Sequence, residues 1–224
     1  MKKYSINMFQ VPPLMAFEYQ GDMNKDLDYV YNLEYITQNG IKKGTEINVN
    51  DNSVSLSSRS TNDHILNDDQ LKDLKQFCLD SVHEYVYEVV GIEHEIVIQQ
   101  SWVNISKPSQ HLFEHYHPNS FISGVFYFVS DQEKGSPITF TSELHKHNFS
   151  VQKLSDEEPE KYFPCTAQRF QHPSIPGQLL LFSSTTSHEV QANESDKDRI
   201  SLSFNTYPKL PYGNLWGLNV LSVP

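Results

Sequence analysis

The sequence contains little cysteine, with Cys78 and Cys165 far apart in a chain of 224 residues. Two distant cysteines exclude a disulfide-dense scaffold and a cysteine-rich zinc cluster, and they suit a reducing cytoplasm. Long apolar runs are also missing: no stretch of about 18 apolar residues occurs, so no membrane-spanning helix is expected. Lys2 and Lys3 are not followed by the apolar segment of a signal peptide.

Basic residues are scarce as well. The chain has 17 Lys and Arg against 28 Asp and Glu, which gives a formal net charge of −11. An acidic chain is a poor binder of phosphate backbones, so we expect no nucleic-acid partner. Aromatic residues are plentiful by contrast, with 13 Phe and 12 Tyr, and they favour β-sheet. The length fits a single domain.

The first part of the chain predicts one helix and a long polar loop. Residues 23–38 have a helical pattern that Asn39-Gly40 would stop. The apolar face of this helix would contain Leu27, Val30 and Tyr31. Residues 41–67 are rich in Asn, Ser and Thr, so we expect a loop with one short strand near residues 54–58.

A second helix is predicted more clearly, over residues 68–90. Its apolar residues recur at three- and four-residue steps, which is the pattern of an amphipathic helix. Asn67 would cap its start, with Gln70 three residues later as in a capping box, and Gly91 would end it. We expect this helix to brace a sheet.

Short strands with turn signals between them predict a β-sandwich or barrel after residue 95. The expected strands are residues 96–105, 121–129, 138–140, 178–182, 189–192 and 199–206. Residues 143–176 form a long insert rich in Pro, Lys and Glu. Loops of this length are uncommon in compact domains and are often functional lids.

Three histidines form a candidate metal site. His115 and His117 are two residues apart, and in a strand such residues point to the same face. Neutral imidazole is a common ligand of iron, zinc, copper and nickel. His188 follows a buried strand and a polar loop, and it is the best candidate for a third ligand. The other seven histidines, including the pair His145 and His147, lack a matched partner.

The strand after His188 adds a candidate carboxylate site. Its polar residues Arg199, Ser201, Ser203 and Asn205 alternate with apolar Ile200, Leu202 and Phe204. The planar guanidinium of arginine matches a carboxylate bidentately, and Ser201 could share that carboxylate. Each feature alone also fits an exposed strand or a chance histidine pair. Together they predict a metal beside a carboxylate site.

This combination resembles the 2-oxoglutarate/Fe(II) oxygenase superfamily, where an HxD or HxE motif and a distal histidine bind iron. In that superfamily an arginine about ten residues past the distal histidine binds 2-oxoglutarate, and here Arg199 is eleven residues past His188. The sequence is most similar to a subfamily of bacteria and marine phages. Its motifs occur here as His-x-His-Pro-Asn-Ser from residue 115, Ser-Gly-Val-x-Tyr from 123, Pro-Gly-x-Leu-x-x-Phe from 176, and Arg-x-Ser-x-Ser-Phe-Asn from 199.

The resemblance implies a mainly β fold, a double-stranded β-helix (jelly roll) with supporting N-terminal α-helices. It divides a single oxygenase domain into helical support and lid over residues 1–95, a jelly-roll core over 96–210 and a tail over 211–224. It also implies Fe(II), 2-oxoglutarate and O2 as cofactor and co-substrates.

The resemblance assigns roles to seven residues. Iron would be bound by His115, His117 and His188, and 2-oxoglutarate by Arg199 and Ser201, with Tyr127 and Asn104 as further contacts. One departure matters, because His117 occupies the position where the superfamily has a carboxylate. Either the centre has three histidines, or an oxygen ligand comes from Glu114 or Asn119.

Two other functions stay open at this point. One is a cupin-like iron enzyme that does not use 2-oxoglutarate, which has no fixed need for Arg199 and Ser201. The other is a jelly-roll binding or structural module. For the oxygenase we expect a small-molecule or peptide substrate, hydroxylation as the reaction, no membrane partner, and the cytoplasm (the host's, for a phage protein) as location. A homodimer is left open.

Overall fold

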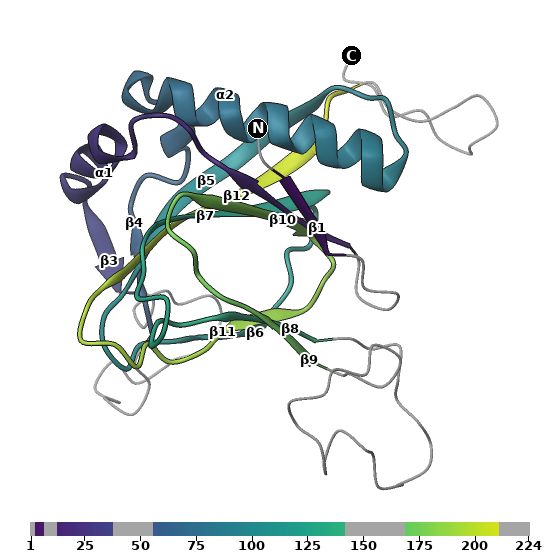
Figure 1. Ribbon diagram of the computed structural model, residues 1–224. Helices are drawn as coiled ribbons and strands as arrows, with labels where there is room; N and C mark the ends of the chain where they lie inside the picture. Colours follow the sequence, from purple (N-terminus) through teal and green to yellow (C-terminus); the bar gives the residue numbers. More distant parts are fainter. Residues whose placement is uncertain (1–2, 7–12, 38–55, 142–168, 211–224) are drawn as a thin grey trace, which may run out of the picture.

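Two antiparallel sheets form the body of the protein (Figure 1). The computed structural model describes residues 3–6, 13–37, 56–141 and 169–210. The larger sheet contains, in spatial order, β1 (Lys3–Ile6), β2 (Leu14–Glu18), β10 (Gln178–Ser183), β7 (Ile122–Val129), β12 (Arg199–Pro208), β5 (Ile96–Ser106), β4 (Ser58–Ser60) and β3 (Tyr35–Thr37). The smaller sheet contains β6 (Leu112–His115), β11 (His188–Val190), β8 (Ile138–Thr141) and β9 (Arg169–His172). Two facing antiparallel sheets are the predicted jelly-roll architecture, which is therefore confirmed.

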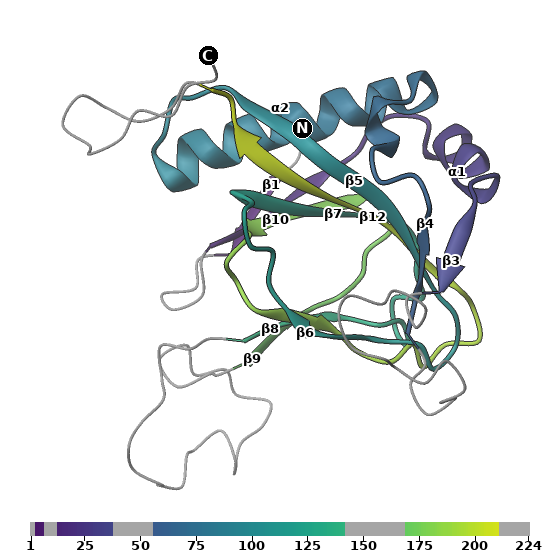
Figure 2. The ribbon, with the colours of Figure 1, turned by 180° about the vertical axis from the view of Figure 1, so that it is seen from behind.

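Among the described residues, the helices cover the outer face of the larger sheet. The long helix α2 (Lys72–Tyr85) crosses that face, and α1 (Met23–Tyr31) lies at one end of it, while the smaller sheet lies on the opposite side (Figures 1 and 2). The prediction of supporting N-terminal helices is confirmed. No helix in the described ranges is long and apolar enough to cross a membrane.

The helix predicted over residues 68–90 is present, but only Lys72–Tyr85 is regular α-helix. Two 3-10 turns, η2 (Ile65–Asn67) and η3 (Asp69–Leu71), precede α2, and a π-helical turn η4 (Val86–Val90) follows it. Gly91 ends the helix with φ of +72°, as predicted. The predicted cap was wrong: the position before α2 is Leu71 without a side-chain cap, and Asn67 accepts a hydrogen bond from Lys75 instead.

The helix predicted over residues 23–38 was too long. It ends at Tyr31, and residues 35–37 form β3, which pairs with β4. The aromatic and β-branched side chains of this segment suit a strand, and a long-range partner strand is available to it. Tyr31, expected on the apolar face, is 57% exposed, whereas Val30 is fully buried.

The main core lies between the larger sheet and α2. Neighbouring strands contribute side chains in register, including Phe17, Leu179, Phe126, Leu202 and Val103. They pack with Leu74, Cys78 and Val82 of α2, which are fully buried. Full burial of such a side chain is worth roughly 1.5–3 kcal/mol, so this layer stabilises the sheet that supports the site.

Gly124 in β7 leaves no room for a side chain beside Phe204 of this core. A Cβ at this position would lie 2.2 Å from Cζ of Phe204 in β12. We therefore predict that Gly124→Ala lowers the free energy of unfolding by about 1–3 kcal/mol, because the buried ring of Phe204 must move. Urea denaturation measures the change. Phe204→Leu in the Gly124→Ala background should recover part of the loss, and a loss that stays the same there would contradict this explanation.

Several sequence predictions fall outside the described ranges. These are most of the insert over residues 143–176, most of the loop over 41–67, the tail over 211–224, and the pair His145 and His147. In the described part, five strands were not predicted from the sequence, namely β1, β2, β3, β6 and β9. They are short, and all five lie at or next to the edge of a sheet.

Candidate metal centre and ligand pocket

The polar face of β12 points into the space between the two sheets. Its register pairs Ser201 with Asn104, Ser203 with Trp102 and Asn205 with Gln100 on β5, and directly paired residues share a face. These polar side chains line one pocket, whereas Ile200 and Leu202 belong to the core against α2, and Phe204 belongs to that core and also borders the pocket. The alternation predicted for residues 199–205 is confirmed.

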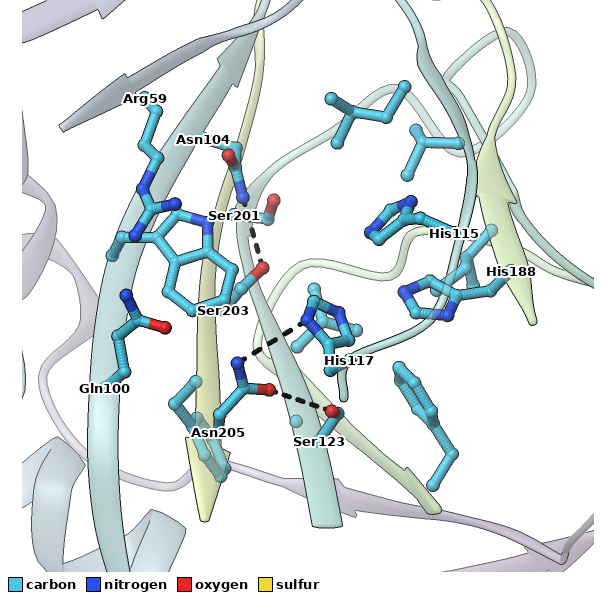
Figure 3. Close-up of a pocket in the computed structure, with 18 of the residues that line it drawn as sticks. Arg59, Gln100, Asn104, His115, His117, Ser123, His188, Ser201, Ser203 and Asn205 are labelled. Carbon is cyan, nitrogen blue, oxygen red and sulfur yellow. Dashed lines mark hydrogen bonds between the residues drawn. The ribbon is translucent and has the colours of Figure 1, made fainter. Parts of the chain in front are cut away.

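Three imidazole rings meet at the other side of this pocket (Figure 3). His188 in β11 pairs directly with His115 in β6, and their ring centroids are 4.4 Å apart. The ring of His117 lies 5.1 Å from that of His115 and 5.2 Å from that of His188. One ligand nitrogen from each histidine lies within 4.8 Å of the others. The structure thus brings together the three histidines that the sequence singled out.

His117 is not on the same strand as His115, although the sequence pattern predicts one strand for both. β6 ends at His115, and His117 follows it in a turn where Asn119 has φ of +61°. The backbone N–H of His117 donates to the carbonyl of Ser184, 2.9 Å away. A hydrogen bond to a neighbouring loop, and not strand alternation alone, therefore positions this ring.

Backbone carbonyls orient two of the imidazoles. Nδ1 of His115 lies 2.6 Å from the carbonyl oxygen of Phe113, and Nδ1 of His188 lies 2.9 Å from that of Thr186. A carbonyl can only accept, so each Nδ1 carries the proton and each Nε2 keeps its lone pair. Such carbonyl-held imidazoles are typical of metal ligands.

Burial keeps two of the histidines neutral. Burial first, and the nearby His115 and Arg59 second, lower the pKa of His117 to about 4. Burial is also the largest cause that lowers the pKa of His188, which is 4% exposed, to about 3; His115 and His117 add to this lowering and the hydrogen bond to the carbonyl of Thr186 opposes it. A neutral imidazole is the form that binds a metal, so these rings are ready to ligate at neutral pH.

These pKa values predict how the metal-free protein responds to acid. Each folded-state pKa lies below the ordinary value of 6.5, so the unfolded state binds more protons and stability falls as the pH drops below that value toward 4. The double variant His117→Gln/His188→Gln should lose less stability than the parent between about pH 7.5 and about pH 5. Urea denaturation of both metal-free proteins measures this, and equal losses would contradict it.

Neither candidate oxygen ligand, Glu114 or Asn119, is among the residues that line the pocket with the histidines. The carboxylate of Glu114 accepts a hydrogen bond from Ser187, 2.7 Å away, and this bond is the largest cause of its lowered pKa. Asn119 lies in the turn after His117. Within the described ranges the cluster consists of His115, His117 and His188 without a carboxylate.

Arg199 is a buried cation at the end of β12, and it is 2% exposed. Its Nε donates to Ser174 Oγ at 3.0 Å and one terminal nitrogen donates to Ser201 Oγ at 3.2 Å. No acidic residue of the described part forms an ion pair with it. A buried charge without a counter-ion is unfavourable, so this guanidinium requires an anion from outside the described chain.

Asn104 and Tyr127, the two further contacts expected for 2-oxoglutarate, differ in their position relative to the pocket. Asn104 lines the pocket, and its amide nitrogen donates to Ser203 Oγ at 3.1 Å. Tyr127 lies behind Arg199, whose guanidinium carbon is 5.1 Å from the centre of its ring. The Tyr127 hydroxyl is buried without a hydrogen bond of standard geometry, and burial raises its pKa. Tyr127 therefore supports Arg199 and does not itself line the pocket.

The pocket has a volume of about 350 Å³ and joins the histidines to Arg199. Sequence reasoning missed Arg59, Gln100 and Trp102 as part of its wall. Arg59 lies in a segment without periodicity, and its place depends on the pairing of β4 with β5. Trp102 and Gln100 lie in β5, where strand alternation placed them on the same face as Asn104.

One family matches part of the sequence. Residues 100–205, which run from β5 to β12, match the family described as "Putative 2OG-Fe(II) oxygenase". No curated protein matches the sequence.

Solved structures resemble the fold at low sequence identity. The alpha-ketoglutarate-dependent epimerase SnoN from nogalamycin biosynthesis has a TM-score of 0.58 at 13% identity, covering 89% of this chain and 79% of its own. HygX from Streptomyces hygroscopicus, with nickel, 2-oxoglutarate and hygromycin B bound, has 0.55 at 12%, covering 95% and 93%. A prolyl-4-hydroxylase from Pseudomonas putida has 0.51 at 11%, covering 88% and 92%. These likenesses confirm the jelly-roll fold.

Proposed function

We infer that this chain, whose residues 100–205 belong to the 2OG-Fe(II) oxygenase family, is a 2-oxoglutarate-dependent non-heme iron oxygenase. His115, His117 and His188 would bind Fe(II), and Arg199 with Ser201 would bind 2-oxoglutarate. The observation that carries this assignment is the buried Arg199, which has no acidic partner in the described chain and shares a pocket with three histidines.

The residues that line the pocket fit both Fe(II) and 2-oxoglutarate. Three imidazole ligands suit Fe(II) and leave other coordination positions open for small ligands. The guanidinium of Arg199 matches the distal carboxylate of 2-oxoglutarate, and the hydroxyl of Ser201, already 3.2 Å from it, can donate to the same carboxylate. A cupin-like enzyme or a binding module would give no reason for a buried arginine at this place.

Bound Fe(II) with O2 and 2-oxoglutarate supplies the oxidising chemistry, in which 2-oxoglutarate is decarboxylated to succinate while the substrate is oxidised. The protein residues position the reactants and exclude water. The carbonyls of Phe113 and Thr186 fix two imidazoles, and the ring of Tyr127 supports the guanidinium of Arg199. Asn104 is a further wall contact for the bound molecules.

The remaining parts of the assignment are proposals as well. We propose hydroxylation of a small molecule, in keeping with the hygromycin B bound to HygX. We propose one oxygenase domain, with residues 1–95 as support and lid, 96–210 as core and 211–224 as tail. A cytoplasmic location is proposed from the sparse cysteines, of which Cys78 is free and buried.

A turnover assay tests the function. Protein supplied with Fe(II), O2 and 2-oxoglutarate should form succinate, and formation should cease when iron or O2 is withheld. Iron-dependent O2 consumption that does not need 2-oxoglutarate would instead favour the cupin-like enzyme. Absence of iron binding would favour the binding module.

A further inference from the structure

A second arginine lines the same pocket. Arg59 belongs to β4 and pairs with Asn104 of β5, so both side chains point to the inner face of the sheet. Its guanidinium lies over the ring of Trp102, with the central carbon 4.3 Å from the ring centre. In Figure 3 this group and the three histidines lie on opposite sides of the pocket that they line. Arg59 therefore faces the metal centre from the opposite wall.

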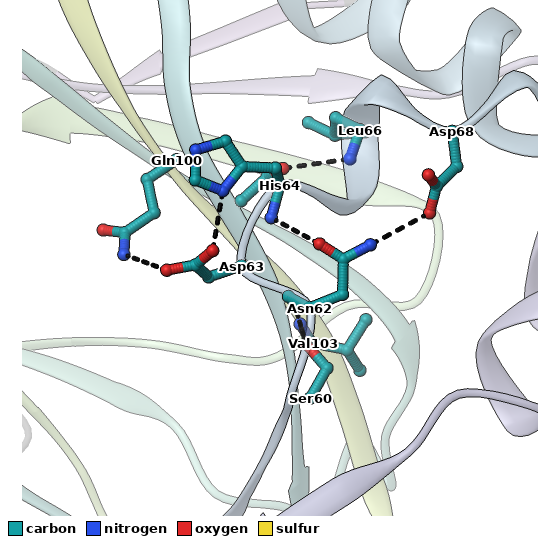
Figure 4. A network of polar contacts seen from close by, with 9 residues as sticks. Ser60, Asn62, Asp63, His64, Leu66, Asp68, Gln100 and Val103 are labelled. Carbon is teal, nitrogen blue, oxygen red and sulfur yellow. Dashed lines mark hydrogen bonds and ion pairs between the residues drawn. The ribbon is translucent and has the colours of Figure 1, made fainter.

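Arg59 has no acidic partner in the described chain. The ion pairs there involve other residues. Asp63 is the acid whose charge acts on it, yet that carboxylate already accepts from His64 Nδ1 at 2.6 Å and from Gln100 Nε2 at 3.2 Å (Figure 4). Burial lowers the pKa of Arg59, which marks a cation that has lost much of its hydration.

The pocket as a whole is positive in an otherwise acidic protein. The described residues that line it include two arginines and three histidines, and none of them is Asp or Glu. The chain carries a formal net charge of −11, so the absence of acid from this wall runs against the overall composition. A neutral three-histidine centre also adds no negative charge of the kind that a carboxylate ligand would bring. Such a pocket favours anionic ligands.

This inference rests on the proposed function, in which Arg199 binds 2-oxoglutarate and Arg59 is left for the substrate. We propose that the primary substrate is an anion whose carboxylate or phosphate group pairs with Arg59. Stacking on Trp102 fixes the plane of the guanidinium, and its planar donors match either group bidentately. The amides of Gln100 and Asn104 lie beside it on the same wall and can bind polar atoms next to the anionic group.

Matched ligands on one scaffold test this assignment. Hippurate carries a carboxylate, hippuramide is its neutral amide, and benzamidomethylphosphonate is its phosphonate. Each is titrated into the full chain saturated with Ni(II) and 2-oxoglutarate, with Trp102 fluorescence as the readout in a Trp216→Phe background. We expect an anion to bind at least about tenfold more tightly than hippuramide, since hydrogen bonds to charged groups are worth about 1.5–3 kcal/mol. The preferred anion distinguishes carboxylate from phosphate substrates.

Substitutions assign the preference to one side chain. Arg59→Met should abolish it and Arg59→Lys should retain part of it, while 2-oxoglutarate affinity changes less than about twofold because Arg199 is intact. The control is Arg169→Met, which removes an exposed arginine paired with Glu189 and should keep the full preference.

Three outcomes would overturn the proposal. The anions could bind no more tightly than hippuramide, the preference could survive Arg59→Met, or Arg59→Met could weaken 2-oxoglutarate as strongly as Arg199→Met. Failure of the proposed function is distinct, because it shows as absence of 2-oxoglutarate binding in the parent protein. In that case the same titrations with Ni(II) alone decide whether Arg59 selects anions.

Discussion

Arg199→Met is expected to weaken 2-oxoglutarate binding by at least about 30-fold without destabilising the metal-free protein. Loss of one partner of a buried charge pair costs about 2–5 kcal/mol, which corresponds to a decrease in affinity of roughly 30-fold to several thousand-fold. The metal-free protein should be as stable as the parent or up to about 4 kcal/mol more stable, because the substitution removes a buried cation that no described acid compensates.

The combination of these two effects makes this prediction specific. An arginine with a purely structural role would lower stability when replaced, and a surface arginine would change neither property. Equilibrium dialysis with 2-oxoglutarate and urea denaturation measure the two effects, with Arg169→Met as the control for an exposed arginine. A marked loss of stability with unchanged 2-oxoglutarate affinity would contradict the role assigned to Arg199.

The second large effect concerns His188, the most buried of the three histidines. His188→Ala should weaken Fe(II) binding by more than about 100-fold, because even the loss of a residue that only orients a ligand costs 10–100-fold. The thermal stabilisation that Fe(II) gives the parent should disappear in the same variant, since stabilisation follows binding to the folded state.

A matched control is available in the smaller sheet. His172 in β9 is also buried, and its Nε2 lies 2.7 Å from Gln178 Oε1, away from the other three rings. His172→Ala should bind iron like the parent, so that any effect of deleting a buried histidine on the fold is separated from ligation. Parental iron affinity in His188→Ala, measured anaerobically with a ferrous chelator, would rule out this ligand.

The sequence predicted the parts of the site that depend on local periodicity. In β12 the side chains must alternate between the two faces, so Arg199 and Ser201 on one face imply a core on the other. His188 could be placed because it follows a continuous apolar strand. His117 was harder to place, since its position depends on a hydrogen bond to Ser184, a loop residue far away in the sequence.

Other features depend on long-range pairing and could not be predicted. Arg59 reaches the pocket only because β4 adds to the edge of β5, and the flanking sequence is polar without a period. The helix over residues 23–38 ends early because residues 35–37 find a partner strand in β4. Asn67 does not cap α2, because two 3-10 turns, the first of which ends at Asn67, precede the helix. Such turns are frequent at helix ends, and the sequence pattern does not distinguish them from a capping box.

Anaerobic titration of the metal-free protein with Fe(II) and then 2-oxoglutarate tests the central claim most directly. We expect a weak visible charge-transfer band that requires both additions. His117→Ala should lose this band, and Arg199→Ala should need far more 2-oxoglutarate to reach it. Iron bound normally without any such band would contradict the claim that this pocket holds Fe(II) and 2-oxoglutarate together.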